Sequence, residues 1–441
     1  MPERNYTYYD FTLSLCPECL RRVDAKIIFE NEKVYMLKNC KAHGRSKVLI
    51  ADDIEYYKNI RNYNKASEYP KTFNTKTHYG CPYDCGLCPD HEQHSCLTVV
   101  EVTDRCNLTC PTCYAGSSPT YGRHRTLEEI KKMLDAIVRN EGEPDVVQIS
   151  GGEPTIHPEF FEILDYAKTL PIRHLMVNTN GIKIAKDFAF AEKLATYTPD
   201  FEIYLQFDSL DNQVLQTLRG ADLAETRLRA IENLNRLNLS TTLVVTLQKG
   251  LNDHEMGSTI DFALKQKCIR GVTFQPTQIA GRLENFEVDE SRITLTEVRR
   301  KILEQSPIFE SDDLIPVPCN PDALVMAYAL KLGDEVSPLT RYINPDDLLN
   351  EGKNTIIYEQ DEQLHGKMIE LFSTGNSVEK ASENLKSIMC CLPEIDAPEL
   401  GYDNLFRIII MQFIDAHNFD VRAIKKSCVH IVNKDYQIIP F

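Results

Sequence analysis

The sequence predicts an α/β protein with a partial (βα)6 barrel as its core. From about residue 97, short apolar segments alternate with longer segments of helical periodicity, which is typical of repeated β/α units around a parallel sheet. Six strands are expected, at residues 98–103, 145–150, 173–178, 201–207, 240–246 and 271–275. Helices are expected between them, for example at residues 126–140, 158–169 and 223–237. In folds of this class, the chemistry lies at the carboxyl ends of the strands.

The segments on either side of this core differ from it in composition. Two strands around a turn at Asn31-Glu32 are expected in an N-terminal β-rich unit. After residue 282 the β/α alternation stops, and helices are expected at residues 291–306, 361–391 and 404–416. The expected parts are therefore a metal-binding β unit (1–60), a polar, Cys-rich cluster segment (61–97), the β/α core (98–282) and a mostly helical C-terminal domain (283–441).

The composition argues against two classes of function. The chain has 441 residues with 49 Lys and Arg against 65 Asp and Glu, a formal net charge of −16. Such an acidic chain is a poor nucleic-acid binder, because phosphate binding needs clustered cations. No apolar run approaches the roughly 20 residues that span a bilayer, and the N-terminus has no apolar signal segment. We therefore expect a cytoplasmic protein without a transmembrane segment, and peripheral contact with a membrane stays open.

Cysteine usage points to metal sites. The chain has 15 cysteines, and most of them lie in short clusters before residue 114. In a cytoplasmic protein, clustered cysteines are more often metal ligands than disulfide partners. Cys268 is isolated and precedes an expected strand, so we expect it in the core.

One triplet has the features of a catalytic site. Cys106, Cys110 and Cys113 have the spacing C-x3-C-x2-C and directly follow the first expected core strand. No further cysteine follows within twenty residues. Three thiolates on a four-iron cluster leave one iron without a protein ligand, and an open metal position is where a substrate or cofactor binds.

A second motif follows the next strand. Gly151, Gly152, Glu153 and Pro154 form a Gly-Gly-Glu-Pro sequence there. The glycines allow the backbone to approach a ligand closely, and Glu153 supplies an acceptor for an ammonium group. The alternative interpretation is a structural zinc site or a chance triplet beside a turn. Both motifs stand at the expected strand ends, which favours the catalytic interpretation.

These two motifs resemble the radical S-adenosylmethionine (SAM) superfamily, and the resemblance covers about residues 98–280. It implies a [4Fe–4S] cluster on Cys106, Cys110 and Cys113, with exchangeable SAM bound to the open iron. Reductive cleavage of SAM then yields a 5′-deoxyadenosyl radical, which needs an electron donor such as ferredoxin or flavodoxin. The resemblance places Tyr114 near the adenine and the Gly-Gly-Glu-Pro motif at the SAM amino group. Asn180 and Asp208, at the ends of the third and fourth strands, would face the SAM ribose or the substrate.

A second triplet has the same spacing but a different setting. Cys81, Cys85 and Cys88 have no strand before them, and Cys96 follows within eight residues as a fourth ligand. Because four ligands close a site, we expect an auxiliary [4Fe–4S] cluster on these four cysteines. The alternative is structural zinc.

Two further sets of cysteines are candidate ligands. Cys16, Cys19, Cys40 and His43 form two knuckles around a hairpin, which predicts one structural Zn or rubredoxin-like Fe ion. Cys319, Cys390, Cys391 and Cys428 are expected to hold a second auxiliary cluster. Their wide separation leaves buried core thiols as the alternative.

The whole chain resembles one narrower group, the archaeal tetraether lipid synthases and related pterin C-methylases. The resemblance rests on Cys16-Pro-Glu-Cys19, the block Cys81–Cys96, Phe274-Gln-Pro276, Pro316-Val-Pro-Cys319, Ser427-Cys-Val-His430 and Ile439-Pro-Phe441. It implies either coupling of lipid chains at an unactivated methyl carbon, or installation of a carbon unit on a pterin from a methylene-folate-type donor. We place the lipid substrate slightly ahead of a pterin or similar small molecule. A non-catalytic iron–sulfur electron carrier is the third hypothesis.

Overall fold

A computed structural model describes residues 4–332, 335–342, 344 and 404–441. A twelve-stranded mixed sheet forms its centre, and six parallel strands lie there in chain order. They are β5 (Leu97–Thr103), β7 (Val146–Gly151), β8 (His174–Thr179), β9 (Phe201–Gln206), β10 (Thr241–Leu247) and β11 (Ile269–Pro276). All six predicted core strands are therefore confirmed.

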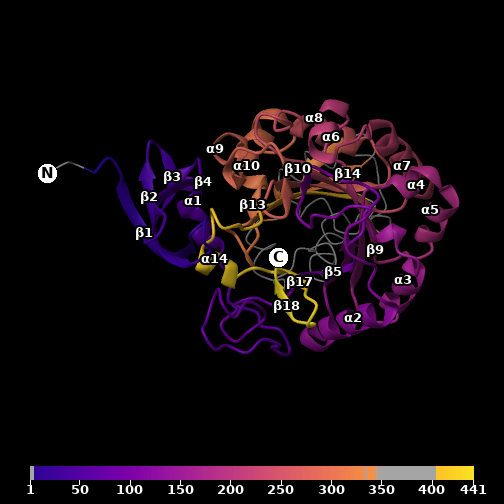
Figure 1. Cartoon of the computed structure of the whole chain (residues 1–441). Helices are drawn as coiled ribbons and strands as arrows, with labels where there is room; N and C mark the ends of the chain where they lie inside the picture. Colours follow the sequence, from indigo (N-terminus) through magenta and orange to yellow (C-terminus); the bar gives the residue numbers. More distant parts are fainter. Residues whose placement is uncertain (1–3, 333–334, 343, 345–403) are drawn as a thin grey trace, which may run out of the picture.

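Helices cover the outer face of these strands in an arc (Figure 1). They are α2 (Leu127–Glu141), α3 (Phe160–Lys168), α4 (Ile182–Lys186), α5 (Phe188–Ala195), α6 (Asn212–Arg219), α7 (Ala224–Leu237) and α8 (Met256–Leu264). Helix α2 shows how the sequence specifies them: Thr126 and Glu129 form a capping box at its start. Its apolar residues recur every three or four positions and pack against the outer face of the sheet.

The C-terminal region extends both edges of this sheet. Strand β16 (Leu405–Met411) pairs in parallel with β11, and β17 (Val429–Val432) pairs in parallel with β5. The remaining elements are β13 (Ile315–Pro316), β14 (Leu324–Leu332), β15 (Glu335–Pro338), β18 (Ile438–Pro440), α9 (Val288–Ser291), α10 (Leu295–Gln305) and α14 (Val421–Lys425). The region is thus joined to the core by its strands.

Two helix predictions for this region have different outcomes. Helix α10 confirms most of the range 291–306. The helix expected at 404–416 is wrong, because β16 occupies that position. Its run of buried apolar residues has several β-branched members and suits a strand covered on both faces. The helix expected at 361–391 lies outside the described residues. None of the described helices is long and apolar enough to cross a membrane.

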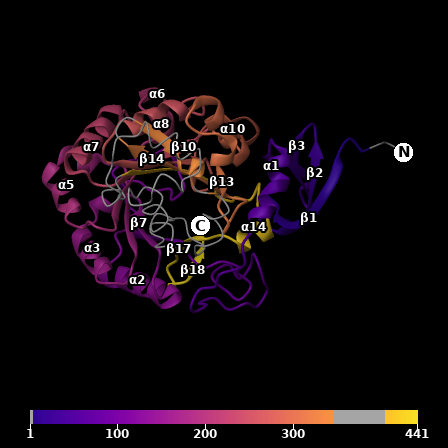
Figure 2. The same ribbon diagram turned by 180° about the vertical axis from the view of Figure 1, so that it is seen from behind.

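A separate four-stranded antiparallel sheet precedes the core. It consists of β1 (Thr7–Leu15), β2 (Arg22–Glu30), β3 (Lys33–Cys40) and β4 (Gly44–Ala51), and helix α1 (Ile54–Asn59) follows it. The predicted turn at Asn31-Glu32 joins β2 to β3, and both residues have positive φ, as a type I′ hairpin turn requires. We call residues 7–51 the ribbon. It stands beside α14 in both views of the molecule (Figures 1 and 2).

Residues on the inner face of the barrel form three layers, because alternate residues of a strand share a face. The layer at the amino ends of the strands is polar and contains His174, Glu202, Thr242 and Arg407. The middle layer is mainly apolar and contains Val146, Met176, Tyr204, Val244 and Ile409. The layer at the carboxyl ends contains Gln148, Asn178, Gln206, Thr246 and Gln275, all of which line a cavity.

A buried ion pair organises the first of these layers. The Nη2 atom of Arg407 lies 2.6 Å from both carboxylate oxygens of Glu202. His174 lies 3.4 Å from the same carboxylate. Burial alone would raise the pKa of Glu202, but Arg407 and His174 outweigh it and hold this pKa well below its usual range. The pair joins β16 to β9, so it ties the C-terminal region to the core.

Arg407→Met is expected to destabilise the protein, because it leaves a buried carboxylate without its cation. Removing one partner of a buried ion pair costs about 3–5 kcal/mol. Urea unfolding of anaerobically purified protein measures this loss. Arg229→Met, at an exposed position of α7, is the control. An effect of Arg407→Met no larger than that of the control would contradict the stabilising role of the pair.

Candidate active site and metal centres

A cavity of about 180 Å³ opens at the carboxyl ends of the strands. Most of the site residues predicted for the core line it: Cys106, Cys110, Cys113, Tyr114, Gly151, Gly152, Glu153 and Asn180. Pro154 and Asp208 do not line it. The cavity is therefore where the sequence places the chemistry, at the ends of parallel strands.

The two glycines of the Gly-Gly-Glu-Pro motif lie against the loop that leads to Cys106. A Cβ on Gly151 would lie 2.3 Å from the Thr103 carbonyl oxygen, and one on Gly152 would lie 2.2 Å from that of Arg105. The Gly152 amide also donates to Thr103 O at 2.8 Å. The glycines thus permit close approach of two backbone segments. The approach to a ligand that the sequence suggested stays a prediction, since both glycines also line the cavity.

The Glu153 carboxylate is buried and already heavily hydrogen-bonded. Its Oε1 accepts bonds from the amide and hydroxyl of Thr155 and from the Thr179 hydroxyl, at 2.6–3.1 Å. Its Oε2 accepts one bond, from the Asn180 amide at 2.7 Å. A carboxylate offers about four lone-pair positions, two on each oxygen. Oε2 can therefore accept one more donor, such as an ammonium group in the cavity.

Arg219 joins the segment that follows strand β9 to residues 106–117, which we call the cysteine loop. Its Nε and Nη2 atoms each lie 2.7 Å from the Asp208 carboxylate, and its Nη1 donates to the Thr112 carbonyl at 3.2 Å. Asp208 also accepts from the Thr246 amide and the Gln206 carboxamide. The Asp208 side chain therefore positions Arg219 and Gln206.

Arg227 is a cation in the cavity wall that the sequence analysis did not single out. Its side chain is 0% exposed, and its Nη1 donates to the Asn180 carbonyl. In the described part of the chain, its Nε and Nη2 have no hydrogen-bond partner. Burial lowers the pKa of Arg227 to about 10, so it is still charged at neutral pH. Two unpaired donors of a buried cation suit a carboxylate or another anion.

A sequence signal for Arg227 does exist. Ala230, Ile231 and Leu234 form a buried apolar stripe on α7, and position 227 falls within the same stripe. A charged residue at a core position of an amphipathic helix is rare unless it has a partner.

The layer of carboxamides forms the floor of the cavity. Gln206 donates to Thr246 Oγ1 at 3.3 Å, and Gln275 donates to the Tyr204 hydroxyl at 3.0 Å. No described residue donates a hydrogen bond to the side-chain oxygens of Gln206 and Gln275. These oxygens, together with Gln148, give the cavity several fixed polar positions.

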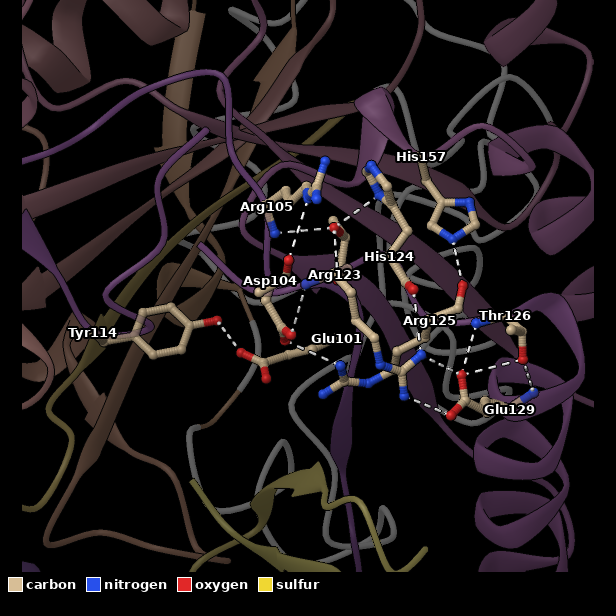
Figure 3. A network of polar contacts seen from close by, with 12 residues as sticks. Glu101, Asp104, Arg105, Tyr114, Arg123, His124, Arg125, Thr126, Glu129 and His157 are labelled. Carbon is tan, nitrogen blue, oxygen red and sulfur yellow. Dashed lines mark hydrogen bonds and ion pairs between the residues drawn. The ribbon is translucent and has the colours of Figure 1, made fainter. Parts of the chain in front are cut away.

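A polar network holds the segment around the start of the cysteine loop (Figure 3). The Tyr114 hydroxyl donates to the Glu101 carboxylate of β5 at 3.3 Å. The Asp104 carboxylate accepts from Arg125 at 3.0 Å and from the Arg123 amide at 3.3 Å. Tyr114 also packs edge-to-face on Phe441, with ring centroids 5.0 Å apart. Tyr114, which lines the cavity, is thus fixed next to the third cysteine.

The three thiols suit a metal cluster. Burial raises the pKa of the Cys106 thiol to about 12 and also raises that of Cys110. Buried thiols of this kind lose their protons when a metal binds them. The amide of Leu108 donates to the Cys106 sulfur at 3.4 Å. The ligand set, the cavity beside it and the unpaired donors of Arg227 together fit an iron–sulfur cluster with a charged ligand beside it.

The ribbon brings its four predicted ligands together. The Cys16 and Cys40 sulfurs lie 3.5 and 3.6 Å from His43 Nδ1, and the Cys19 and Cys40 sulfurs lie 3.8 Å apart. Tetrahedral Zn–S and Zn–N bonds separate neighbouring ligand atoms by about 3.5–3.8 Å. Backbone amides of Ala42 and His43 lower the pKa of Cys40 to about 6, which favours a thiolate ligand. The four atoms fit one tetrahedral metal ion.

Comparison with known proteins agrees with both sites. Residues 100–263 match the model of the radical SAM superfamily, and residues 8–52 match that of the HMPTM N-terminal zinc ribbon domain. Over 98% of its length the chain is 32% identical to 7,8-dihydro-6-hydroxymethylpterin dimethyltransferase of Methanocaldococcus jannaschii, 92% of which is covered. The chain belongs to the radical SAM superfamily. It is therefore an enzyme, and membership implies a [4Fe–4S] cluster and SAM.

Other relatives of this radical SAM enzyme match over shorter stretches. Identity is 28% to GTP 3′,8-cyclase of Pseudomonas fluorescens, over 53% of this chain and 69% of that protein. It is 30% to mycofactocin maturase MftC of Mycolicibacterium smegmatis, over 35% of this chain and 38% of that one. Among solved structures, Streptococcus suis SuiB matches with a TM-score of 0.40 at 18% identity, covering 48% of this chain and 46% of SuiB.

The structure groups the remaining cysteines of the radical SAM enzyme differently from the sequence prediction. Cys96, Cys319 and Cys428 are buried, with their sulfurs within 4.8 Å of one another. The pairing of β17 with β5, which places Val429 opposite Leu97, brings Cys428 to Cys96. Hydrogen bonds from the other two thiols lower the pKa of Cys428. Cys96 was expected beside the second triplet, and this long-range strand pairing could not be read from local spacing.

The second triplet lies in a loop without regular structure. Cys88 is buried, Cys81 is half-buried and Cys85 is exposed. Cys390 and Cys391, which were expected to join Cys319 and Cys428, lie outside the described residues. Cys268 is in the core, as predicted.

Cys96→Ala and Cys319→Ala are expected to remove the same metal centre, whereas Cys85→Ala removes a different one. The reason is that the sulfurs of Cys96 and Cys319 share one pocket. Iron and sulfide content per chain, with Mössbauer spectra of the anaerobically reconstituted variants, measures this. Cys268→Ala, a buried thiol outside these groups, is the control. If Cys96→Ala and Cys85→Ala lost the same centre, the grouping seen in the structure would be wrong.

Proposed function

We propose that this radical SAM enzyme is a C-methyltransferase that acts on a reduced pterin or a closely similar heterocycle. The observation that carries the proposal is the layer of carboxamides on the cavity floor, supplied by Gln148, Asn178, Gln206 and Gln275. The pyrimidinone edge of a dihydropterin alternates hydrogen-bond donors and acceptors. Fixed carboxamides can match such an edge, because each offers one donor group and one acceptor.

The relative from Methanocaldococcus jannaschii supports the same substrate class. Its name specifies a dihydropterin dimethyltransferase, and the similarity extends over nearly the whole of both chains. Lipid-chain coupling, which the sequence analysis placed first, needs a long apolar tunnel. A polar floor is a poor end for such a tunnel, since an acyl chain would leave the carboxamides unpaired. Lipid coupling is therefore the weaker alternative, and a non-catalytic carrier does not agree with membership of an enzyme superfamily.

In this proposal, different cavity residues bind different parts of SAM. Arg227 binds the SAM carboxylate through its two unpaired donors, and Glu153 Oε2 accepts from the SAM ammonium group. Tyr114 packs against the adenine, and Asn180 faces the ribose. Asp208 acts indirectly, through Arg219 and Gln206.

Cys106, Cys110 and Cys113 would hold the [4Fe–4S] cluster, which supplies the one-electron chemistry that cleaves SAM. The protein orients the substrate above the cysteine loop and limits access of water. Aromatic side chains contribute to that enclosure, because Phe441 contacts both Tyr114 and Phe413 at the cavity wall.

Three further metal centres belong to the proposal. Cys81, Cys85 and Cys88 hold one auxiliary [4Fe–4S] cluster, and Cys96, Cys319 and Cys428 hold a second. The ribbon holds one Zn or Fe ion. A ferredoxin or flavodoxin supplies the electrons.

The proposal is tested by anaerobic incubation of the iron-loaded enzyme with SAM, a reductant, a methylene-folate-type donor and 7,8-dihydro-6-hydroxymethylpterin. We expect 5′-deoxyadenosine and a methylated pterin by mass spectrometry. Cys110→Ala should abolish both, since it removes a cluster ligand. Gln275→Leu should raise the pterin KM about three- to tenfold, as expected for one lost hydrogen bond. Lipid and pterin profiles after anaerobic expression of this protein in a host that naturally lacks it complete the test: bridged lipid chains without a methylated pterin would contradict the proposal.

Arg227→Met is expected to weaken SAM binding without unfolding the protein. A charge-assisted hydrogen bond contributes about 1.5–3 kcal/mol, so the Kd for SAM should rise about 10- to 100-fold. The free energy of unfolding should change little, because Met replaces a buried cation that makes a single hydrogen bond, to the Asn180 carbonyl, with an apolar chain. Equilibrium binding and urea unfolding measure the two effects, with Arg229→Met on the same helix as the control. Unchanged SAM affinity would exclude Arg227 as the carboxylate ligand.

A further inference from the structure

We propose that the ribbon positions the catalytic cysteine loop, and that Lys38 and Arg282 are the positioning residues at the two ends of a series of backbone segments joined by hydrogen bonds. The ribbon lies beside α14 at one end of the molecule, away from the arc of helices α2 to α8 (Figures 1 and 2). Two short segments connect it to the cysteine loop: residues 413–420, called the strap, and residues 277–283, called the brace.

The first link joins the ribbon to the strap. Lys38 Nζ, on β3, donates to the Ala416 carbonyl at 2.6 Å and to the Leu15 carbonyl at 2.9 Å. The Ser14 hydroxyl donates to the Phe419 carbonyl at 2.5 Å. Lys38 is only 3% exposed. A buried ammonium needs such acceptors, so these bonds fix the strap against the ribbon.

The second link joins the strap to the brace. Gln278 Nε2 donates to the Ile414 carbonyl at 2.9 Å, and the Ile279 amide donates to the Asp415 carboxylate at 3.2 Å. Arg292 holds the same carboxylate at 2.9 Å, and both partners are buried. The brace thus takes its position from a strap that the ribbon anchors.

The third link joins the brace to the cysteine loop. Arg282 donates to the carbonyls of Cys110 at 2.6 Å, Ser117 at 2.7 Å and Gly116 at 3.3 Å. Strand β12 (Arg282–Leu283) pairs antiparallel with β6 (Thr112–Cys113). One planar guanidinium therefore donates hydrogen bonds to carbonyls on both sides of the third cysteine.

The glycine next to Arg282 shows how closely the two segments pack. Gly281 has φ +64°, and a Cβ there would lie 2.1 Å from the Tyr114 carbonyl oxygen. The cysteine loop has only the two residues of β6 in regular structure. Its shape therefore depends on contacts from outside, and the three links supply them. Catalytic groups need placement within about 0.5 Å, which gives the ribbon a role beyond its own stability.

Lys38→Met tests the first link. The variant keeps all four ribbon ligands, so the ribbon metal should stay bound. We expect an altered EPR spectrum of the reduced catalytic cluster with SAM. We also expect 5′-deoxyadenosine formed per methylated product to rise about tenfold, since a small displacement of catalytic groups costs up to about 100-fold in rate. Lys47→Met, on β4, is the matched control, because Lys47 contacts Glu30 and Tyr35 within the ribbon.

The EPR readout needs no pterin, so it separates this inference from the proposed function on which the product ratio rests. Thr12→Val combined with Ser14→Ala is a milder second variant, which removes two strap contacts and should produce the same changes if Lys38→Met does not fold. Arg282→Met removes the contact with the cysteine loop itself, so it should alter the EPR spectrum more strongly. A spectrum of Lys38→Met, or of the double variant, that matches Lys47→Met would overturn the proposal.

Discussion

Hydrogen bonds from two arginines to backbone carbonyls hold the cysteine loop in its conformation. Residues 106–117 carry the three cluster cysteines but contain only a two-residue strand. Arg219 binds the carbonyl of Thr112, and Arg282 binds those of Cys110, Gly116 and Ser117. Because guanidinium donors are rigid and charged, they can hold a loop that has little backbone pairing of its own. Each arginine is in turn anchored elsewhere: Arg219 by Asp208, and Arg282 by its place in the brace.

The interior of the barrel, below this loop, consists of polar and apolar layers of side chains. Apolar side chains face the outer helices, as in any β/α fold. On the inner face, a polar layer closes the amino end through Arg407 and Glu202, and the carboxamide layer lies under the cavity. The apolar layer between them separates the two. Polar groups can therefore be buried at both ends of the barrel. At the amino end they have partners in the protein, and at the carboxyl end they face a cavity in which a ligand can bind.

The C-terminal region completes the site from both edges of the sheet. Strand β16 contributes Met411 to the cavity and Arg407 to the buried ion pair, while β17 contributes Val429. The same strand β17 places Cys428 next to Cys96 and Cys319. A single region therefore builds part of the cavity wall, part of a candidate metal centre and one face of the barrel. Its strands and those of the core belong to one sheet.

Sequence alone determined the six core strands, the cysteine triplet at their carboxyl end and the four-ligand ribbon site, since each of these depends on local periodicity or spacing. The tertiary structure decided the rest. Cys96 joins Cys319 and Cys428 through a strand pair more than 300 residues apart in the chain, which no spacing rule encodes. The segment 404–416 was expected as a helix and is a strand, because its burial on both faces overrides a short apolar pattern. The roles of Arg227 and the carboxamides can be inferred only from the cavity that they line. The role of a buried polar side chain depends on its partners, or on their absence, and the tertiary structure decides both.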